Sequence, residues 1–435
     1  MKQVLLQLYR LVVVGVIAWL IRDVAVRQRT HGDSPIVVDE VKVFFPEAVG
    51  LRPDDSARDG LFVIGRAGGE LGYVVRTQPQ CRDILGYAGV TDALVVLDRD
   101  WKIVGVKIHS SEDTQDYVKN IAIDRRFLKK WNGLTWGAAA DLDLAKAGIE
   151  GVSGATMTSM AIARSVKARL QMNRNEIVGR PELQVGWRDV GMLVVLALAA
   201  LLAFGPSEWR HRWKRPYQVL LVVYVGFVAG DLIAMKSLAG WARSGVPWST
   251  APGLVLLTAA ALVVPWATRK PIYCHQICPH GAAQELIWQI AGARAVRPQP
   301  DGSARAGRAP LMLPSGAVHG LEILPFGLLL LGLTVAMLAV PLDLAGLEPF
   351  AAYVVRSAGW ATLTIAAVGL VASFFVPQAY CRFGCPTGAL LNFVRARGAS
   401  DRFSRRDGAA LLLVAVAVAL NWNYLPLLTW VKGVA

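Results

Sequence analysis

The chain has 435 residues, of which 54% are hydrophobic and only 18% are charged. This composition argues against an ordinary soluble enzyme and favours a protein that crosses a membrane several times. Lys and Arg exceed Asp and Glu by 46 to 32. Because much of the excess falls in short loops between apolar runs, it indicates a membrane orientation bias and no nucleic-acid partner.

Residues 1–29 carry two early cations, Lys2 and Arg10, and an apolar stretch from Leu11 to Ile21. We predict an N-terminal signal anchor or transmembrane helix, with an uncleaved export signal as the alternative.

Residues 30–187 have the composition of a soluble mixed domain, with alternating apolar residues and turn pairs. The pattern predicts an α+β domain of one compact unit. Its expected elements are two hairpins followed by two helices: Leu61–Ile64 with Leu71–Val75, Ala93–Leu97 with Lys102–Ile108, Tyr117–Trp131 and Met160–Met172.

The apolar runs of residues 188–435 predict an all-α polytopic membrane domain. Six apolar runs are each long enough, or nearly so, to span a hydrocarbon core about 30 Å thick. These runs are Val190–Phe204, Tyr217–Met235, Ala251–Ala267, Ala317–Val340, Val355–Val376 and Gly408–Leu425.

Cations in the connecting loops predict the orientation. The loops Arg210–Arg215, Arg269–Arg308 and Arg382–Arg406 are basic, and the alternate loops are not. Basic loops stay in the cytoplasm, so we expect a bacterial inner-membrane protein whose domain 30–187 is extracytoplasmic, in the periplasm. Cys81 would then face the exterior alone, as a free or buried thiol.

A run of small and hydroxyl residues from Glu150 to Ser159 precedes the last helix of the mixed domain. Small residues let the backbone approach a bulky group, and Thr158 or Ser159 can cap a helix whose N-terminal amides favour a phosphate. A plain helix cap is the alternative interpretation.

The tetrapeptide Ser153-Gly154-Ala155-Thr156 resembles the covalent-flavin motif of FMN-binding domains in Na⁺-pumping quinone reductase, Rnf and NosR-type proteins. The resemblance implies an FMN phosphate esterified to Thr156 by a flavin transferase, with Thr158 beside it. The family motif usually begins with aspartate, where this chain has Glu150.

Two further landmarks extend this resemblance over about residues 60–172. The turn 86–89 resembles the glycine-tyrosine turn of the same domain, and residues 109–114 resemble its His…Glu-Thr element. The resemblance therefore implies flavin-binding roles for His109, Glu112 and Thr114. A structural histidine is an equally good interpretation of His109.

A second motif occurs twice, at Tyr273–Ala282 and Tyr380–Ala389, and each copy follows two predicted spans. Both copies contain C-x3-C-P, and the four cysteines are Cys274, Cys278, Cys381 and Cys385. Four thiolates on one membrane face are enough for a shared [4Fe-4S] cluster, because such clusters take four cysteine ligands. A structural zinc site is the alternative, since four thiolates also suit tetrahedral zinc.

This half resembles the membrane core of NosR/NirI proteins, NapH-type quinol dehydrogenases and PceC-like proteins, which carry paired C-x3-C-P motifs. No C-x2-C-x2-C-x3-C-P run follows the second copy, so the layout is most similar to the PceC-like group. The resemblance implies a membrane FMN-binding iron–sulfur protein, with a quinone among the spans as a further candidate cofactor.

The function implied is electron transfer between a cytoplasmic-side iron–sulfur centre, or quinol, and an extracytoplasmic FMN. The implied partners are membrane lipid, a cytoplasmic ferredoxin, flavodoxin or quinol donor, and an exported reductase or its maturation. For such an electron-transfer flavoprotein, or quinol dehydrogenase-like component, we assign no catalytic side chain. A redox-sensing membrane regulator or assembly factor is the alternative.

Overall fold

The computed structural model describes residues 2–31, 35–56, 58–124, 126–172, 183, 185–291, 311, 313–340, 342–354, 358–397 and 401–424. The chain divides into two compact units. The sheet unit comprises Ala25–Gln184 and Gly240–Pro252, and the helical unit comprises Met1–Val24, Val185–Ala239 and Gly253–Ala435. Parts of the predicted domain 30–187 and of the basic loop Arg269–Arg308 lie outside the described residues, as does Leu425.

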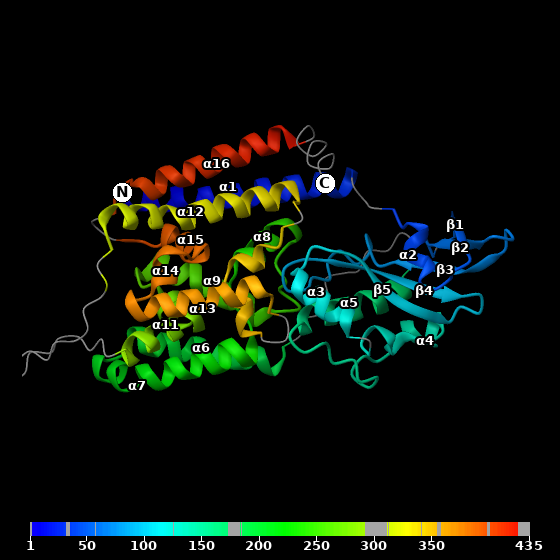
Figure 1. Cartoon of the computed structure of the whole chain (residues 1–435), viewed down its shortest axis with the longest axis horizontal. Helices are drawn as coiled ribbons and strands as arrows, with labels where there is room; N and C mark the ends of the chain where they lie inside the picture. The colour runs from blue at the N-terminus through cyan, green and yellow to red at the C-terminus, as the bar shows by residue number, and fades with distance from the viewer. Residues whose placement is uncertain are drawn as a thin grey trace, which may run out of the picture. The chain divides into compact units, whose positions relative to one another are not determined.

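The sheet unit contains a five-stranded antiparallel meander in the order β1-β2-β3-β4-β5 (Figure 1). Its strands are β1 Ala48–Pro53, β2 Leu61–Gly65, β3 Glu70–Arg76, β4 Thr91–Asp98 and β5 Ile103–Ser111. Strands β2 and β3 pair around the turn at Gly68, and β4 pairs with β5. Both hairpins expected from the sequence are therefore confirmed.

Alternation along β4 gives the sheet two buried faces. Leu94 and Val96 pack with Val63, Val74 and Val41 in one apolar cluster. Because successive strand residues point to opposite faces, the intervening residues of β4 face the other side, where helix α5 packs. The helices of this unit are α2 Val38–Lys42, α3 Gln115–Ile123, the 3₁₀ turn η1 Leu128–Trp131, α4 Trp136–Ala140 and α5 Thr156–Gln171.

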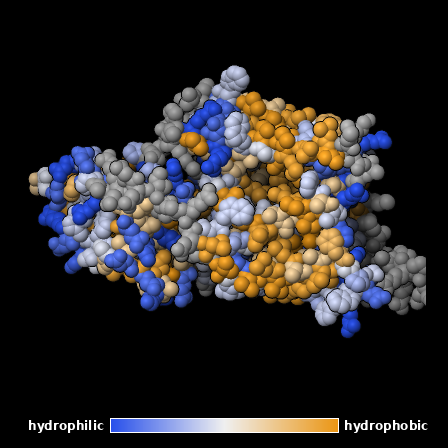
Figure 2. All heavy atoms as spheres, turned by 180° about the vertical axis from the view of Figure 1, so that it is seen from behind, coloured by the Kyte–Doolittle hydropathy of each residue, from blue (hydrophilic) through white to orange (hydrophobic). Residues whose placement is uncertain are grey.

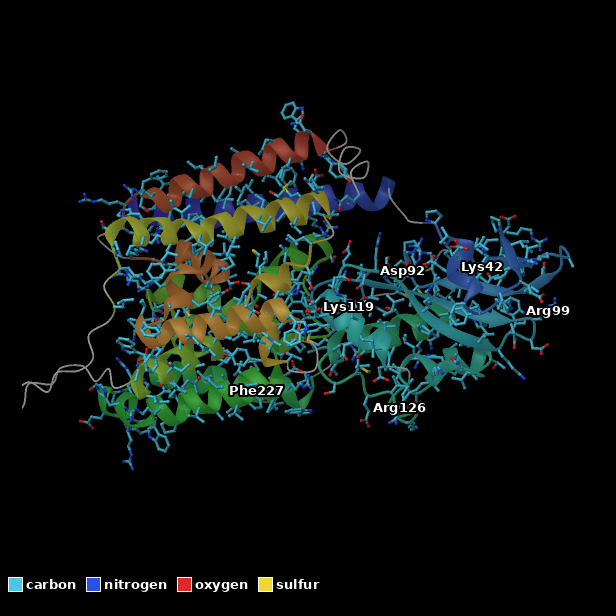
Figure 3. The ribbon with its side chains drawn as sticks, in the orientation of Figure 1. Lys42, Asp92, Arg99, Lys119, Arg126 and Phe227 are labelled. Atoms are coloured by element: carbon cyan, nitrogen blue, oxygen red, sulfur yellow. The ribbon has the colours of Figure 1, made fainter. Side chains whose placement is uncertain are left out.

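Asp92, labelled in Figure 3, fixes the entry to β4. Its buried carboxylate accepts hydrogen bonds from Gln78 N (3.0 Å) and Thr77 Oγ1 (3.1 Å) and pairs with Arg76 Nη2 at 2.6 Å. A buried carboxylate is tolerated where such donors replace water.

The helical unit contains most of α1 and the helices that follow residue 185. The last residues of α1 and of α8 belong to the sheet unit. The elements of α structure are α1 Lys2–His31, α6 Trp187–Phe204, α7 Ser207–Leu220, α8 Met235–Ser244, α9 Pro252–Thr268, α10 Ile272–Gln276, α11 Pro279–Ile290, α12 Ser315–Leu338, α13 Trp360–Phe375, α14 Ala379–Phe383, α15 Pro386–Val394 and α16 Arg405–Trp422. The others are the π-helix η2 Leu221–Ala229 and the 3₁₀ turns η3 Leu344–Leu347 and η4 Phe350–Tyr353.

Among the described residues, three helices are long and apolar enough to cross a membrane: Val4–Gln28, Trp187–Phe204 and Ser315–Leu338. Two shorter apolar helices, Pro252–Thr268 and Trp360–Phe375, match further predicted runs. Figure 2 shows hydrophobic side chains over much of the visible face of the helical unit. Large apolar areas of this kind mark a membrane or protein contact.

The run Tyr217–Met235, expected as one span, does not form one helix. It continues α7 into η2, which ends at Gly230 in the left-handed region with φ 70°. Phe227, labelled in Figure 3, lies on η2 with its ring centroid 5.4 Å from that of Tyr353. A non-helical backbone follows, buried within the unit, and its Ile233 N–H donates to Tyr273 Oη at 3.0 Å. Irregular backbone at membrane depth needs such internal partners.

Helix α1 runs without a break through Arg10, whose side chain is fully buried. The guanidinium donates from Nε to Asp407 Oδ1 and from Nη1 to Asp401 Oδ2, both at 2.8 Å. Two carboxylates therefore neutralise this buried cation, which lies within an apolar part of the helix. Paired charges are the form in which ionisable residues are tolerated in apolar surroundings.

Candidate cofactor sites

A tight turn leads into helix α5 in the sheet unit. Gly154 adopts φ 84°, Ala155 is the N-cap and Thr156 is the first helical residue. Ser159 Oγ accepts a hydrogen bond from Val152 N at 2.8 Å and so ties the turn to the first helical turn. The positive φ explains the glycine, because residues with a Cβ rarely adopt that conformation.

The two candidate threonines have different surroundings. Thr156 is partly exposed, and its Oγ1 donates to Val152 O at a long 3.3 Å. Thr158 is fully buried, and its Oγ1 donates to Asp113 Oδ2 at 2.7 Å. Of these two threonines, only Thr156 is partly exposed.

Asp113 joins three segments of this site, and the sequence had not singled it out as a site residue. Its fully buried carboxylate accepts hydrogen bonds from Tyr87 N at 2.9 Å and Ala88 N at 3.0 Å, besides the one from Thr158. A Cβ at Gly86 would overlap this carboxylate, which explains why the turn 86–89 begins with glycine.

The other residues expected to bind flavin have partners of their own. His109 Nδ1 lies 2.8 Å from Glu40 Oε1 of α2, and Glu112 Oε2 accepts from Ser244 Oγ at 2.5 Å. Thr114 is the buried N-cap of α3, and its Oγ1 has no hydrogen-bond partner among the described residues. Ser153 is exposed, and its carbonyl accepts from Asn120 at 3.0 Å. The structure thus brings Thr114, Asp113 and Thr158 together, and His109 has a separate hydrogen-bonding partner in Glu40.

Residues 240–252, which run from the second half of α8 to the first residue of α9, belong to the sheet unit. Trp241 Nε1 donates to Tyr87 O at 3.1 Å, and Thr250 Oγ1 donates to Leu85 O at 3.2 Å. A Cβ at Gly240 would overlap the carbonyl of Ala88. This segment therefore closes over the same turn that Asp113 holds from the other side.

The two cysteine motifs fold alike in the helical unit. In each copy a short helix, α10 or α14, carries the first cysteine, and the second cysteine is the N-cap of α11 or α15. The following proline occupies the first helical position in both copies, where its missing N–H costs nothing. The sequence repeat is therefore also a structural repeat.

All four cysteines line one cavity of about 270 Å³. Gly388 N donates to Cys385 Sγ at 3.1 Å, and Gln284 Nε2 donates to Cys381 Sγ at 3.0 Å. Gln284 lies on α11 of the first copy, and its Oε1 also accepts from Tyr380 N of the second copy at 3.0 Å. Gln284 thus ties the two copies together, a role that no spacing in the sequence indicated.

Residues from the segment between α12 and α13 pack beside these motifs. Tyr353 Oη lies 3.1 Å from His280 Nδ1, and Glu348 accepts from Thr387 Oγ1 at 2.6 Å and from Met235 N at 2.5 Å. Both Glu348 and His280 are buried. His280 Nε2 has no hydrogen-bond partner within the described part of the chain.

Two models of known protein families match the chain, one at each candidate site. A family model described as an FMN-binding domain matches residues 86–171. A second, described as a 4Fe-4S binding domain, matches residues 250–297 and 358–406 and so covers both cysteine motifs. The chain carries an FMN-binding domain and a 4Fe-4S binding domain.

Curated relatives match about half of the chain. The chain is 26% identical over 224 residues to YccM of Escherichia coli, across 48% of this chain and 58% of the relative. It is 27% identical to the regulatory protein NosR of Pseudomonas aeruginosa across 51% of this chain and 31% of the relative.

The protein NirI of Paracoccus denitrificans is 25% identical across 46% of this chain and 30% of its own length. The chain thus spans between about a third and three fifths of these relatives. No solved structure matches.

The residues present fit both groups. In the FMN-binding domain, the buried Thr114 hydroxyl lacks a partner and the N-terminal amides of α5 adjoin Thr156. In the 4Fe-4S binding domain, four thiols surround one cavity and two of the sulfurs already accept hydrogen bonds. Among the residues that the structure describes, no three His, Cys, Asp or Glu side chains form a site for a single metal ion.

Proposed function

We propose that the protein passes electrons across a bacterial inner membrane between a [4Fe-4S] centre held by Cys274, Cys278, Cys381 and Cys385 and an FMN on Thr156. The observation that carries this proposal is the single cavity that all four cysteines line, in a chain that also contains an FMN-binding domain. A cluster offers separate iron atoms to separate thiolates. A zinc ion instead needs its sulfur ligands about 2.3 Å from one point.

Attachment of FMN to Thr156 is supported by exposure and by electrostatics. Thr156 is the first residue of α5, so the free amides of the first helical turn adjoin its side chain. Such amides and the helix dipole favour a phosphate at this position. Thr158 is unsuited because esterification would break its bond to Asp113 and place a phosphate in a buried site.

The bound groups would supply the redox chemistry, and the chain would place and tune them. Gln284 Nε2 and Gly388 N donate to sulfur and would favour the thiolate form, and hydrogen bonds to ligating sulfurs adjust the potential of a cluster. The cation distribution supports cytoplasmic cysteines and a periplasmic FMN domain. We propose a cytoplasmic ferredoxin, flavodoxin or quinol as donor and an exported reductase, or its maturation, as acceptor.

A redox-sensing regulator is the second candidate function. Two observations favour it: relatives named as regulatory proteins, and the contacts of residues 240–252 with the turn 86–89 of the FMN-binding domain. In this version the flavin state would change how Trp241 holds that turn and how Ser244 holds Glu112.

Steady turnover separates the two functions. Full-length protein in anaerobic vesicles should show donor-dependent flavin reduction that repeats as an external acceptor reoxidises the flavin. Cys381→Ser should abolish this reduction, and Cys81→Ala, which changes the one cysteine outside the motifs, should leave it unchanged. A single reduction that no acceptor can cycle would support the regulator and contradict the conduit.

A further inference from the structure

A second cavity of about 540 Å³ lies beside the cysteine cavity in the helical unit. Its charged lining consists of four cationic side chains and one carboxylate, a net of +3 with histidines neutral: Arg210, Lys214, Lys270, Arg395 and Glu285. A concave site with this charge favours an anion.

The cations are held largely by main-chain carbonyls. Lys270 Nζ donates to Ala203 O at 2.6 Å, Arg210 Nε donates to Leu202 O at 3.3 Å, and Arg395 Nε donates to Arg269 O at 2.8 Å. Lys214 pairs with Glu285 at 3.0 Å. Carbonyls orient these side chains but do not cancel their charge, so the cavity keeps an excess of positive charge.

The apolar part of the lining places this cavity at the end of a candidate span. Leu202 and Ala203 are in the last turn of α6, and Lys270 Nζ lies 4.4 Å from the ring centroid of Phe204. Cations at a helix C-terminus, beside apolar side chains that end a span, are typical of the membrane interface. A ligand here would need an anionic group and an attached apolar chain.

We propose that this cavity binds the phosphate headgroup of an anionic phospholipid, with Lys270 and Arg210 as its principal contacts. A cavity of this volume is in the usual range for a small ligand, and basic pockets between membrane helices suit phosphate headgroups. A free phosphate shares the headgroup chemistry but would leave the apolar wall uncovered.

The site adjoins the proposed cluster. Cys274, His275, Gln378 and Arg395 line both this cavity and the cysteine cavity. A negative charge bound here would oppose the addition of an electron to the cluster in the cysteine cavity, because like charges repel. The bound lipid would therefore lower the reduction potential of the cluster, and this step rests on the proposed function.

Lipid binding is tested on full-length protein purified in mild detergent, with phosphatidylglycerol retention measured by native mass spectrometry. The double variant Lys270→Gln/Arg210→Gln should retain several-fold less phosphatidylglycerol than Arg402→Gln/Arg405→Gln, which removes the same charge from exposed residues near the start of α16. Lys270→Arg should retain the lipid.

Three results would overturn the proposal. The first is equal lipid retention in both double variants, and the second is displacement of the lipid by inorganic phosphate alone. The third is that the Lys270→Gln/Arg210→Gln variant keeps the lipid but is no longer reduced by an acidic donor protein. The second result would assign the site to free phosphate, and the third to protein docking. The measurement of lipid retention needs no iron or flavin, so it stands apart from the proposed function.

The effect on the cluster is a second readout. Its midpoint potential should be lower in phosphatidylglycerol nanodiscs than in phosphatidylcholine nanodiscs, and the difference should vanish in the Lys270→Gln/Arg210→Gln variant. An equal difference in that variant would show that the lipid acts from elsewhere.

Discussion

Thr158 Oγ1 donates a 2.7 Å hydrogen bond to Asp113 Oδ2, and this bond joins the first turn of α5 to the turn 86–89. The same carboxylate accepts from Tyr87 N and Ala88 N. The start of α5, the turn 86–89 and the N-cap of α3 therefore share one buried acceptor. We infer that Asp113 is a positioning residue for the FMN site.

Asp113→Ala should lower the thermal stability of the FMN-binding domain and reduce flavin incorporation. Hydrogen bonds to a charged group contribute about 1.5–3 kcal/mol each, and their donors would be left buried without an acceptor. Thermal unfolding and in-gel flavin fluorescence of the full chain measure both effects. Asp100→Asn, in the exposed turn after β4, is the control and should change neither. Normal stability and incorporation in Asp113→Ala would remove the positioning role.

Thr156→Ala should abolish covalent flavin, whereas Thr156→Ser should keep it because the hydroxyl remains. Protein co-expressed with an exported flavin transferase is separated on denaturing gels and viewed by fluorescence. Thr158→Ala removes the bond to Asp113 and should weaken folding while leaving some fluorescent product. Fluorescence that disappears only with Thr158→Ala would show that Thr158, and not Thr156, carries the ester, and would contradict our account.

Cys81 should be unreactive in the folded protein. Burial raises the pKa of its thiol from 9.0 to about 12, and its Sγ donates to Ser165 O at 3.4 Å. Since the folded pKa is the higher one, this group favours folding below pH about 9 and loses that contribution as the pH rises toward about 12. Iodoacetamide at pH 8 should modify the Cys81 peptide only after unfolding, as mapped by mass spectrometry. Modification of folded protein would contradict the burial.

Arg10→Met should destabilise the helical unit by about 3–5 kcal/mol, because removing one partner of a buried ion pair leaves uncompensated charge. Here the two carboxylates of Asp401 and Asp407 would keep only one cation, that of Arg406. Unfolding in detergent measures the loss. Arg22→Met on an exposed position of the same helix is the control. Adding Asp401→Asn and Asp407→Asn to Arg10→Met should restore part of the stability, and no restoration would contradict the charge argument.

Exterior-specific labelling tests the orientation. A membrane-impermeant maleimide on intact spheroplasts should modify Arg99→Cys, at the exposed β4–β5 turn labelled in Figure 3, and should spare Arg405→Cys until the membrane is opened. The opposite pattern would place the cysteine motifs outside and invert the proposed direction across the membrane.

Short sequence patterns predicted those helices and strands whose formation depends on residues close together in the chain. The Gly68 turn, the alternation of β4 and the run before α5 gave both hairpins and the helix with small errors at their ends. The repeat of C-x3-C-P predicted that both motifs share one site, and the structure places all four thiols around one cavity.

The remaining features depend on contacts between distant residues. Asp113 and Gln284 act through partners 45 and 97 positions away, which no spacing reveals. Hydropathy also gave Tyr217–Met235 as one span, because it records apolar content and does not detect the π-helix or the left-handed Gly230.

The most direct test of the account is the iron and flavin content of anaerobically purified full-length protein, read together with its low-temperature electron paramagnetic resonance after reduction. We expect one covalent FMN and a four-iron cluster signal per chain. Replacing any one of Cys274, Cys278, Cys381 or Cys385 with Ser should remove the cluster signal and leave the flavin attached, and Cys81→Ala should change neither. Zinc in place of iron, or a cluster signal that survives all four substitutions, would contradict the shared cluster.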